Sequence, residues 1–250
     1  MAFVWLVAGQ YDRAFAQSTN ASTPAIRAEA AYQAAHTRYH LQPDDPDAAW
    51  QLGRACFDRG EFATNDTDRA AAAQEGIDVC ERAADRNPKL AATHYYLAMD
   101  LGELARTKSL GALPLLRRME QEWSLALQLD EAFDYAGPDR NLGILYTESP
   151  GWPLSIGSRA KARQHLLRAV RLHPDYPENH LNLIEAYQKW NDRDEARAEV
   201  KALQLILPQA RKQFSGPDWE SSWTDWDNRW HTFTNKLKPA APPEHPGGKK

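Results

Sequence analysis

An internal repeat is the feature of this 250-residue sequence that most constrains its fold. The clearest copy runs from Pro177 to Pro208. If Pro177 is counted as position 1, apolar or small residues stand at positions 7, 8, 11, 20, 24 and 27, and a proline stands at position 32: Leu183, Ile184, Tyr187, Ala196, Val200, Leu203 and Pro208. Such spacings place side chains on one face of an α-helix, so the copy predicts two helices packed together. Asn191 stands at the intervening turn, where asparagine tolerates a left-handed backbone.

Three longer segments share this register, at residues 46–88, 91–131 and 136–174, and residues 24–43 resemble an unpaired second helix. The pattern resembles the tetratricopeptide (TPR) repeat, in which each copy is an antiparallel helical hairpin and a proline often ends the second helix. Such hairpins stack on their neighbours to bury a continuous core. The sequence therefore predicts an all-α fold, with a TPR-type α-solenoid over residues 24–208.

The three longer copies have extra residues between positions 8 and 20. The span is 12 residues in the Pro177 copy and 23, 21 and 19 in the others, so we expect inserts of about eleven, nine and seven residues in the turns within the hairpins. Inserts at one repeated place lie along one edge of a solenoid, which often carries the binding surface.

The last insert contains the stretch PGWPLSIG at residues 150–157. Its prolines restrict the backbone, its glycines permit bends, and Trp152, Leu154 and Ile156 supply apolar area. These side chains either fold over the solenoid edge as local core, which we favour for Trp152, or line a binding pocket.

The sequence beyond the last repeat has a different pattern. Aromatic residues spaced by four and three positions form a single helical stripe, Trp219, Trp223, Trp226, Trp230 and Phe233. We expect residues 209–237 to hold a helix that caps the last hairpin, with a ligand-facing aromatic wall as the alternative. Residues 238–250 are rich in proline, glycine and lysine and are predicted to be a disordered tail.

The N-terminal residues allow two interpretations. An apolar run at residues 2–8 is followed by Ala14-Phe15-Ala16 and then Gln17, the small-x-small form of a signal-peptidase site, but a cationic segment is missing. Residues 1–16 are therefore either an export signal or a frayed helix, followed by a linker at 17–23. No cysteine near this site could carry a lipid anchor.

Charge and hydropathy limit the partners. Thirty basic and 34 acidic residues give a net charge of -4, so the sequence has no basic excess that favours nucleic acid or an anionic membrane. No apolar run reaches the roughly 18 residues of a transmembrane helix.

Sequence motifs of catalysis are missing. The chain has no GxSxG, Walker, HExxH or EF-hand pattern, so we predict a non-enzymatic protein without a cofactor or metal. His36 and His40 have a metal-compatible spacing on a helix, but no third ligand is near in sequence, and a solvated helix face is the favoured interpretation. Asp44, Asp45 and Asp47 fit a helix cap.

Two cysteines occupy facing positions of the first long copy, Cys56 at position 11 and Cys80 at position 24. They could form a disulfide if the protein is exported, with a stabilisation of about 3 kcal/mol. The alternative, which we favour, is that they are two small buried core residues.

Candidate binding residues come from positions 5 and 9 of successive copies, which are expected to face the inner groove. They are Trp50 and Arg54, Tyr95 and Met99, Arg140 and Ile144, and Leu181 and Glu185. This mixed lining suits an amphipathic ligand, such as an organic acid, or a loop of a partner protein. Ordinary packing against the next helix is the alternative for each of them. Trp152 and Leu154 complete the set.

Residues 95–174 also resemble the T-component (TatT) family of TRAP transporters. The likeness includes Ala105-Arg106, Ala136-Gly137-Pro138 with Arg140, and the Pro150–Leu154 insert that ends at Gly157. It implies an exported, periplasmic helical protein that works beside a solute-binding receptor and has a cavity for a small organic or hydrophobic ligand. A lipidation cysteine typical of that family is missing. Related hairpins occur in the eukaryotic regulators of microtubule dynamics.

Three functions follow from these features. The leading hypothesis is an accessory protein of TRAP-type solute uptake in the periplasm. The alternative is a TPR scaffold for protein-protein interaction, cytosolic or envelope-associated, that binds no small ligand. A cytoskeletal regulator is the third. Each is compatible with a homo-oligomer.

Overall fold

The computed structural model describes residues 23–108 and 111–236. The predicted N-terminal signal segment and the predicted C-terminal tail lie outside the described residues. Within these two ranges the chain forms ten α-helices and a short 3-10 helix: α1 (Pro24–Leu41), α2 (Pro46–Glu61), α3 (Asp66–Arg86), α4 (Ala91–Arg106), α5 (Leu113–Leu129), α6 (Phe133–Glu148), α7 (Arg159–Leu172), α8 (Pro177–Lys189), α9 (Arg193–Gln213), η1 (Pro217–Trp219) and α10 (Glu220–Lys236). None of these helices is both long and apolar enough to cross a bilayer.

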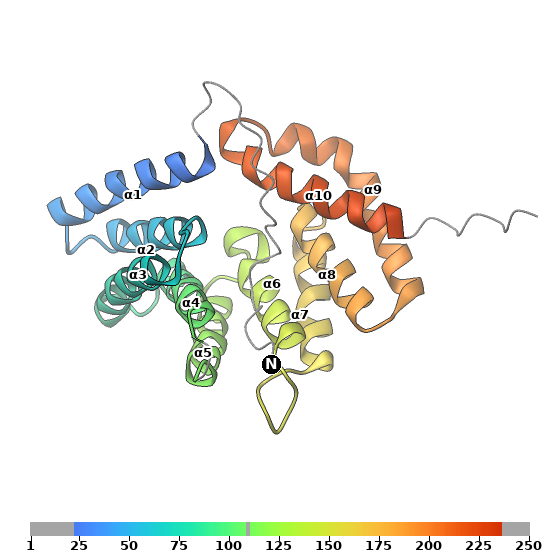
Figure 1. The fold of residues 1–250 in the computed structure, drawn as a ribbon, viewed down its shortest axis with the longest axis horizontal. Helices are drawn as coiled ribbons and strands as arrows, with labels where there is room; N and C mark the ends of the chain where they lie inside the picture. The colour runs from blue at the N-terminus through green and yellow to red at the C-terminus, as the bar shows by residue number, and fades with distance from the viewer. Residues whose placement is uncertain (1–22, 109–110, 237–250) are drawn as a thin grey trace, which may run out of the picture.

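The helices pack as consecutive hairpins, as the repeat predicts. Figure 1 shows α2 beside α3, α4 beside α5, α6 beside α7 and α8 beside α9, while α1 packs on α2 as the unpaired second helix. The inner, first helices of neighbouring hairpins also touch, α2 with α4 and α6 with α8. An ion pair of 3.4 Å between Arg27 in α1 and Glu220 in α10 connects the two ends of the solenoid.

Local sequence sets the helix starts and turns. Pro24, Pro46 and Pro177 open helices, where a missing backbone N–H costs nothing. The Asp45 side chain accepts a 3.0 Å hydrogen bond from the Asp47 N–H, which confirms the predicted cap of α2. Asn191 has a φ of 61° between α8 and α9, as its place in the repeat predicts.

The helix crossings of the first and third hairpins require a glycine at the repeat's position 8, Gly53 and Gly143. A Cβ added at Gly143 in α6 would lie 2.5 Å from Cγ of Leu166 in α7. Because real atoms do not approach so closely, only glycine lets these two helices cross at this distance.

A polar pair that the sequence analysis missed joins the helices of three hairpins at positions 4 and 23 of the repeat. The pairs are His94 with Glu122 at 2.7 Å, Asp139 with His165 at 2.8 Å, and His180 with Glu199. In the first hairpin the equivalent residues are Ala49 and Val79, which pack in one apolar cluster.

The two histidines of position 4 also connect adjacent copies. The second ring nitrogen of His94 lies 3.0 Å from the carbonyl oxygen of Pro88, and that of His180 lies 2.9 Å from the carbonyl of Pro174. Each histidine thereby fixes the start of its hairpin to the end of the preceding one. The repeated histidine, visible in the sequence, is the signal that could have revealed the pair.

The extra residues of the longer copies have different structures. In the first hairpin only residues 62–65 separate α2 from α3, and the added residues lengthen α3 to 21 residues. In the third hairpin residues 149–158 form a true loop. The second helix of the last hairpin does not end at Pro208 as expected, because α9 continues to Gln213 and brings Ala210 and Phe214 into the C-terminal core.

The C-terminal helix caps the last hairpin, which confirms the predicted role of the tryptophan stripe. Trp226 and Phe233 are buried with Tyr176, Leu203 and Phe214 in one cluster, against which Trp219, Trp223 and Trp230 pack. The Trp223 indole donates a 2.6 Å hydrogen bond to the Phe214 carbonyl. The stripe is therefore part of the core.

Candidate functional site

The candidate binding residues of positions 5 and 9 divide into two groups. Arg54 is exposed, Trp50, Met99 and Ile144 are half-buried, and the Glu185 side chain is 43% exposed but paired with Arg229. Tyr95, Arg140 and Leu181 are 2%, 4% and 1% exposed. These last three are core residues, contrary to the prediction that they face the groove, because the inner helices pack so closely that position 5 fills the space between them.

A kink at the start of α6 points neighbouring side chains in different directions, Tyr135 towards the C-terminal cluster and Asp134 towards Tyr95 of α4. Asp134, Tyr135 and Ala136 have φ values of 50°, 55° and 62°, a left-handed backbone that L-residues adopt only when surrounding contacts stabilise it. The Tyr135 ring stacks on Tyr176 with centroids 4.4 Å apart, so it joins the C-terminal cluster. Asp134 accepts a 2.6 Å hydrogen bond from the Tyr95 hydroxyl.

Arg140 stabilises this kink from the interior. Its guanidinium donates a 2.6 Å hydrogen bond to the same Asp134 oxygen and one of 3.2 Å to Asn179 in α8. It also lies over the Tyr176 ring at 5.3 Å. The role of Arg140 is therefore to join α6 to α8.

Six residues from three inner elements form what we call the inner-face site: Trp50, Arg54 and Asp58 of α2, Tyr96 and Met99 of α4, and Asp134 of α6. The Trp50 and Tyr96 rings are stacked, with centroids 5.7 Å apart and planes inclined by 7°. Phe133 lies edge-on to Tyr96 at 6.2 Å. These rings give the site an apolar wall.

Arg54 and Asp58 of the inner-face site are loosely paired. Among the residues that the structure describes, the one ion pair of Asp58 is a 3.9 Å contact with Nε of Arg54. Desolvation raises the pKa of Asp58 to about 6; Arg54 opposes this shift and Asp134 adds to it. The Asp58 side chain is nevertheless 40% exposed. Asp58 is therefore a carboxylate that is partly desolvated yet still open to contact from outside.

The Tyr96 hydroxyl belongs to the same site. Burial raises its pKa above the ordinary value; Asp134 and Asp58 add to this shift, and Arg54 opposes it. Within the described parts of the chain it makes no hydrogen bond. Tyr96 is 7% exposed. The sequence analysis missed Asp58 and Tyr96, since neither occupies position 5 or 9 of its copy.

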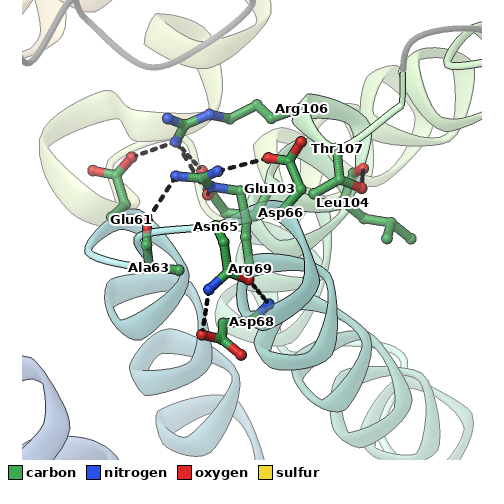
Figure 2. A network of polar contacts seen from close by, with 10 residues as sticks. All are labelled: Glu61, Ala63, Asn65, Asp66, Asp68, Arg69, Glu103, Leu104, Arg106 and Thr107. Atoms are coloured by element: carbon green, nitrogen blue, oxygen red, sulfur yellow. Dashed lines mark hydrogen bonds and ion pairs between the residues drawn. The ribbon is translucent and has the colours of Figure 1, made fainter.

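A polar network lies at one end of the site, where the α2–α3 turn meets the end of α4 (Figure 2). Arg106 donates hydrogen bonds of 3.0 Å to Glu61 and 2.8 Å to Glu103. Arg69 contacts Glu103 at 3.3 Å and donates a 3.1 Å bond to the Ala63 carbonyl. Every charge here has a partner, so the network fixes the turn.

The α6–α7 loop contradicts the prediction for Trp152. Trp152 is 89% and Leu154 is 70% exposed, so neither is local core. The base of the loop is ordered by hydrogen bonds: the Gly157 N–H donates to the Pro150 carbonyl at 2.9 Å, and Ile156 packs on the main core. Because Ile156 alone supplies the inward anchor, the tip can point into solvent (Figure 1).

The two cysteines are free, fully buried thiols in the structure. Burial raises the pKa of both thiols, and Asp100 adds to the shift. This is the packing alternative of the sequence analysis, and the disulfide is not formed.

Two further features of the sequence lie away from the inner-face site. His36 and His40 on α1 have ring nitrogens 3.1 Å apart, and the described residues contain no group of three side chains that could hold a metal. A cavity of about 290 Å³ near the α1–α2 turn is lined partly by Asp44, Asp45 and Arg86. Arg86 is paired with Asp44, so these charges are satisfied within the fold.

The stacked hairpins define the class of this chain: it is a TPR-like helical-repeat protein. The family model of Regulator of microtubule dynamics protein 1-3 matches residues 8–121, which include α1 to α4 and part of α5. No curated protein matches the chain.

Among solved structures, the chain is similar to the crystal structure of TTC0263, a thermophilic TPR protein of Thermus thermophilus. The TM-score is 0.62, with 20% sequence identity over 84% of this chain and 91% of that chain. At this identity the likeness is one of fold, and it agrees with the TPR register read from the sequence.

Proposed function

We propose that this protein is a non-catalytic scaffold that holds a segment of a partner protein on the inner-face site. The observation that carries the proposal is the Trp50–Tyr96 stack beside the loosely paired Arg54 and Asp58. Binding surfaces commonly combine aromatic anchors and arginine with a polar rim, and TPR solenoids bind partners on extended surfaces of this kind.

Two residues of the site, Trp50 and Arg54, are less buried than their neighbours. Arg54 is 59% exposed, and Trp50 is half-buried against the core, where its indole donates a 3.0 Å hydrogen bond to Asp47. Side chains that can lose further water on contact are the ones that contribute binding energy.

Quantitative affinity purification from the native host tests the proposal. The bait carries Trp50→Ala and Arg54→Ala, and a matched bait carries Asp85→Asn on the exposed surface of α3. The inner-face variant should lose at least about tenfold of the specifically enriched partner, equivalent to about 1.4 kcal/mol, while the α3 variant retains it. Equal recovery by both variants would contradict the proposal.

Binding to microtubules is a second candidate, favoured by the family model that matches residues 8–121. Co-sedimentation with polymerised tubulin tests it directly. Saturable binding of the wild-type protein that the inner-face variant lacks would support this candidate, and a protein that stays in the supernatant at all tubulin concentrations would exclude it.

An accessory role in TRAP-type uptake stays a prediction from the resemblance, as does a periplasmic location. Neither the matched family nor the matched structure has a description that mentions transport. Mass mapping of the N-terminus from the native host tests both, because an exported form would begin near Gln17 and co-purify with a solute receptor.

A further inference from the structure

We propose that the open face of α1 is a docking surface for residues 2–16 of this chain, which pack on it as the first helix of one more hairpin. The segment is then part of the folded protein and is retained in it. The inner surface of the solenoid begins one helix earlier, with Trp5 in the position that Trp50 holds in the next copy. This inference does not depend on the proposed function.

The repeat register continues through the N-terminal segment. Residues 5–43 align with residues 50–88 without a gap. Identical residues recur 45 positions apart at the beginning, the middle and the end of these two copies: Trp5 and Trp50, Thr19-Asn20 and Thr64-Asn65, and Pro43 and Pro88. Positions 7, 8 and 11 of the earlier copy are again small or apolar, with Val7, Ala8 and Tyr11. The segment therefore stands in the place of α2 in the next copy, directly before α1 as α2 stands before α3.

The segment has the spacing and the length that this role needs. Val4, Val7, Tyr11 and Phe15 recur at intervals of three and four residues, which places them on one face of an α-helix. Residues 17–23 connect this helix to α1. Seven extended residues reach up to about 23 Å, whereas packed helices lie about 8–10 Å apart. The connection is therefore long enough for the chain to return antiparallel.

The face of α1 that would receive this helix is open. In α3 the side turned towards its own first helix is covered, since Val79 is 2% exposed and packs with residues of α2, and Gly76 is buried. The equivalent residues of α1, Ala34 and Ala31, are both exposed. Tyr32, on another side of α1, is buried against α2. One face of α1 thus packs on the next hairpin, and the face for a first helix of its own is uncovered.

Residue sizes at the expected crossing match. Position 8 meets position 24 in the first hairpin, where a Cβ added to Gly53 would lie 2.3 Å from Sγ of Cys80. The same positions of the proposed hairpin hold Ala8 and Ala35. A larger residue at position 8 is offset by a smaller one at position 24, and such volume-conserving exchanges preserve close packing.

Two observations favour this docking over removal of the segment as an export signal. The family model that matches residues 8–121 begins inside the segment, so the matched domain includes its second half. The apolar run at residues 2–8 also lacks the preceding cationic residues of an export signal. An apolar helix face is stabilised mainly by packing against another element, and the neighbouring element along the chain is α1.

Cysteine pairs in the full-length protein test the proposal. One variant carries Ala8→Cys with Ala35→Cys, which would face one another across the new hairpin. The matched control carries Ala8→Cys with Gln33→Cys; Gln33 and its counterpart in α3, Asp78, are both exposed. Both proteins are oxidised mildly at low concentration, and disulfides are identified in tryptic peptides. The native thiols of Cys56 and Cys80 are buried and do not compete.

The expected result is an intramolecular disulfide that forms at least about tenfold faster in the Ala35→Cys pair than in the Gln33→Cys pair, since a docked helix presents one face only. A second measurement does not need a disulfide. The single variant Ala34→Cys should react with a thiol reagent at least about tenfold more slowly than Gln33→Cys. Adding Val7→Pro, which breaks a helix at that point, should remove this difference.

Four results would overturn the inference. Equal rates for the two pairs would mean that the segment does not dock in one register, and disulfide-linked dimers would assign the face of α1 to a second copy of the chain. Equal labelling of Ala34→Cys and Gln33→Cys would mean that the face stays open. Protein from the native host that begins near Gln17 would show that the segment is removed.

Discussion

Asp100 of α4 provides the sharpest prediction about stability. It is fully buried, and neither of its carboxyl oxygens has a hydrogen-bond partner in the parts of the chain that the structure describes. It fits against Gly76 of α3, where an added Cβ would lie 2.3 Å from Oδ2 of Asp100. Burial raises the pKa of Asp100 well above its ordinary value, and Glu103, Asp58 and Glu75 add to the shift.

The size of the effect follows from proton linkage. In the unfolded chain Asp100 loses its proton near pH 4, whereas the folded protein retains the proton to a higher pH. Between these two pKa values the folded state binds one more proton, so the free energy of unfolding falls by about 1.4 kcal/mol per pH unit. The stabilisation is fully present below the unfolded pKa and is lost as the pH rises through the folded one.

The variant Asp100→Asn removes the contribution of Asp100 to the pH dependence of the free energy of unfolding, because asparagine does not titrate. Urea unfolding of the wild type, Asp100→Asn and the surface variant Asp85→Asn is measured in half-unit steps from pH 4.5 to 7.5. The difference between wild type and Asp100→Asn should change by up to about 1.4 kcal/mol per pH unit, in favour of the variant as the pH rises. Parallel curves for these two proteins would refute the assignment of a buried, proton-retaining Asp100.

Three further predictions follow. Gly76→Ala should lower the free energy of unfolding by about 1–3 kcal/mol in thermal melts. The control Gly102→Ala should change it by less than about 1 kcal/mol, because its Cβ would meet only the end of the Met119 side chain, at 3.3 Å. Equal effects of the two variants would argue against close packing at Gly76. Trp152→Ser should leave stability within about 0.5 kcal/mol, and a larger loss would mean that the loop tip is packed. Cys56 and Cys80 should both be inert to a thiol reagent in the folded protein and both react after unfolding without reductant, while two unreactive thiols in denaturant would indicate a disulfide.

The repeat register was readable from the sequence because each copy places small and apolar residues at the same helical positions. That register predicted the hairpins, the unpaired helix α1 and the left-handed Asn191, and the separate tryptophan stripe predicted the capping role of α10. The prediction that α9 ends at Pro208 is wrong, because proline disfavours but does not forbid a continued helix, and α9 continues through it to bury Ala210.

The binding surface was only partly predictable. Which inner positions stay open depends on how closely neighbouring inner helices approach, and this distance is not encoded in one copy of the repeat. The register therefore identified Trp50 and Arg54 as open but also selected Tyr95 and Arg140, which are buried. The kink at Asp134 had no local signal, because three successive residues without glycine adopt a left-handed backbone there.

The most direct test of the central claim is site-specific photo-crosslinking in the native host. A photo-reactive amino acid replaces Asp47, an exposed residue of α2 beside Trp50, or, as the control, Gln121 on the exposed side of α5. The account predicts that the Asp47 position crosslinks to one recurrent segment of a partner protein and that the Gln121 position does not. Crosslinks to that partner from Gln121 with none from Asp47 would contradict it.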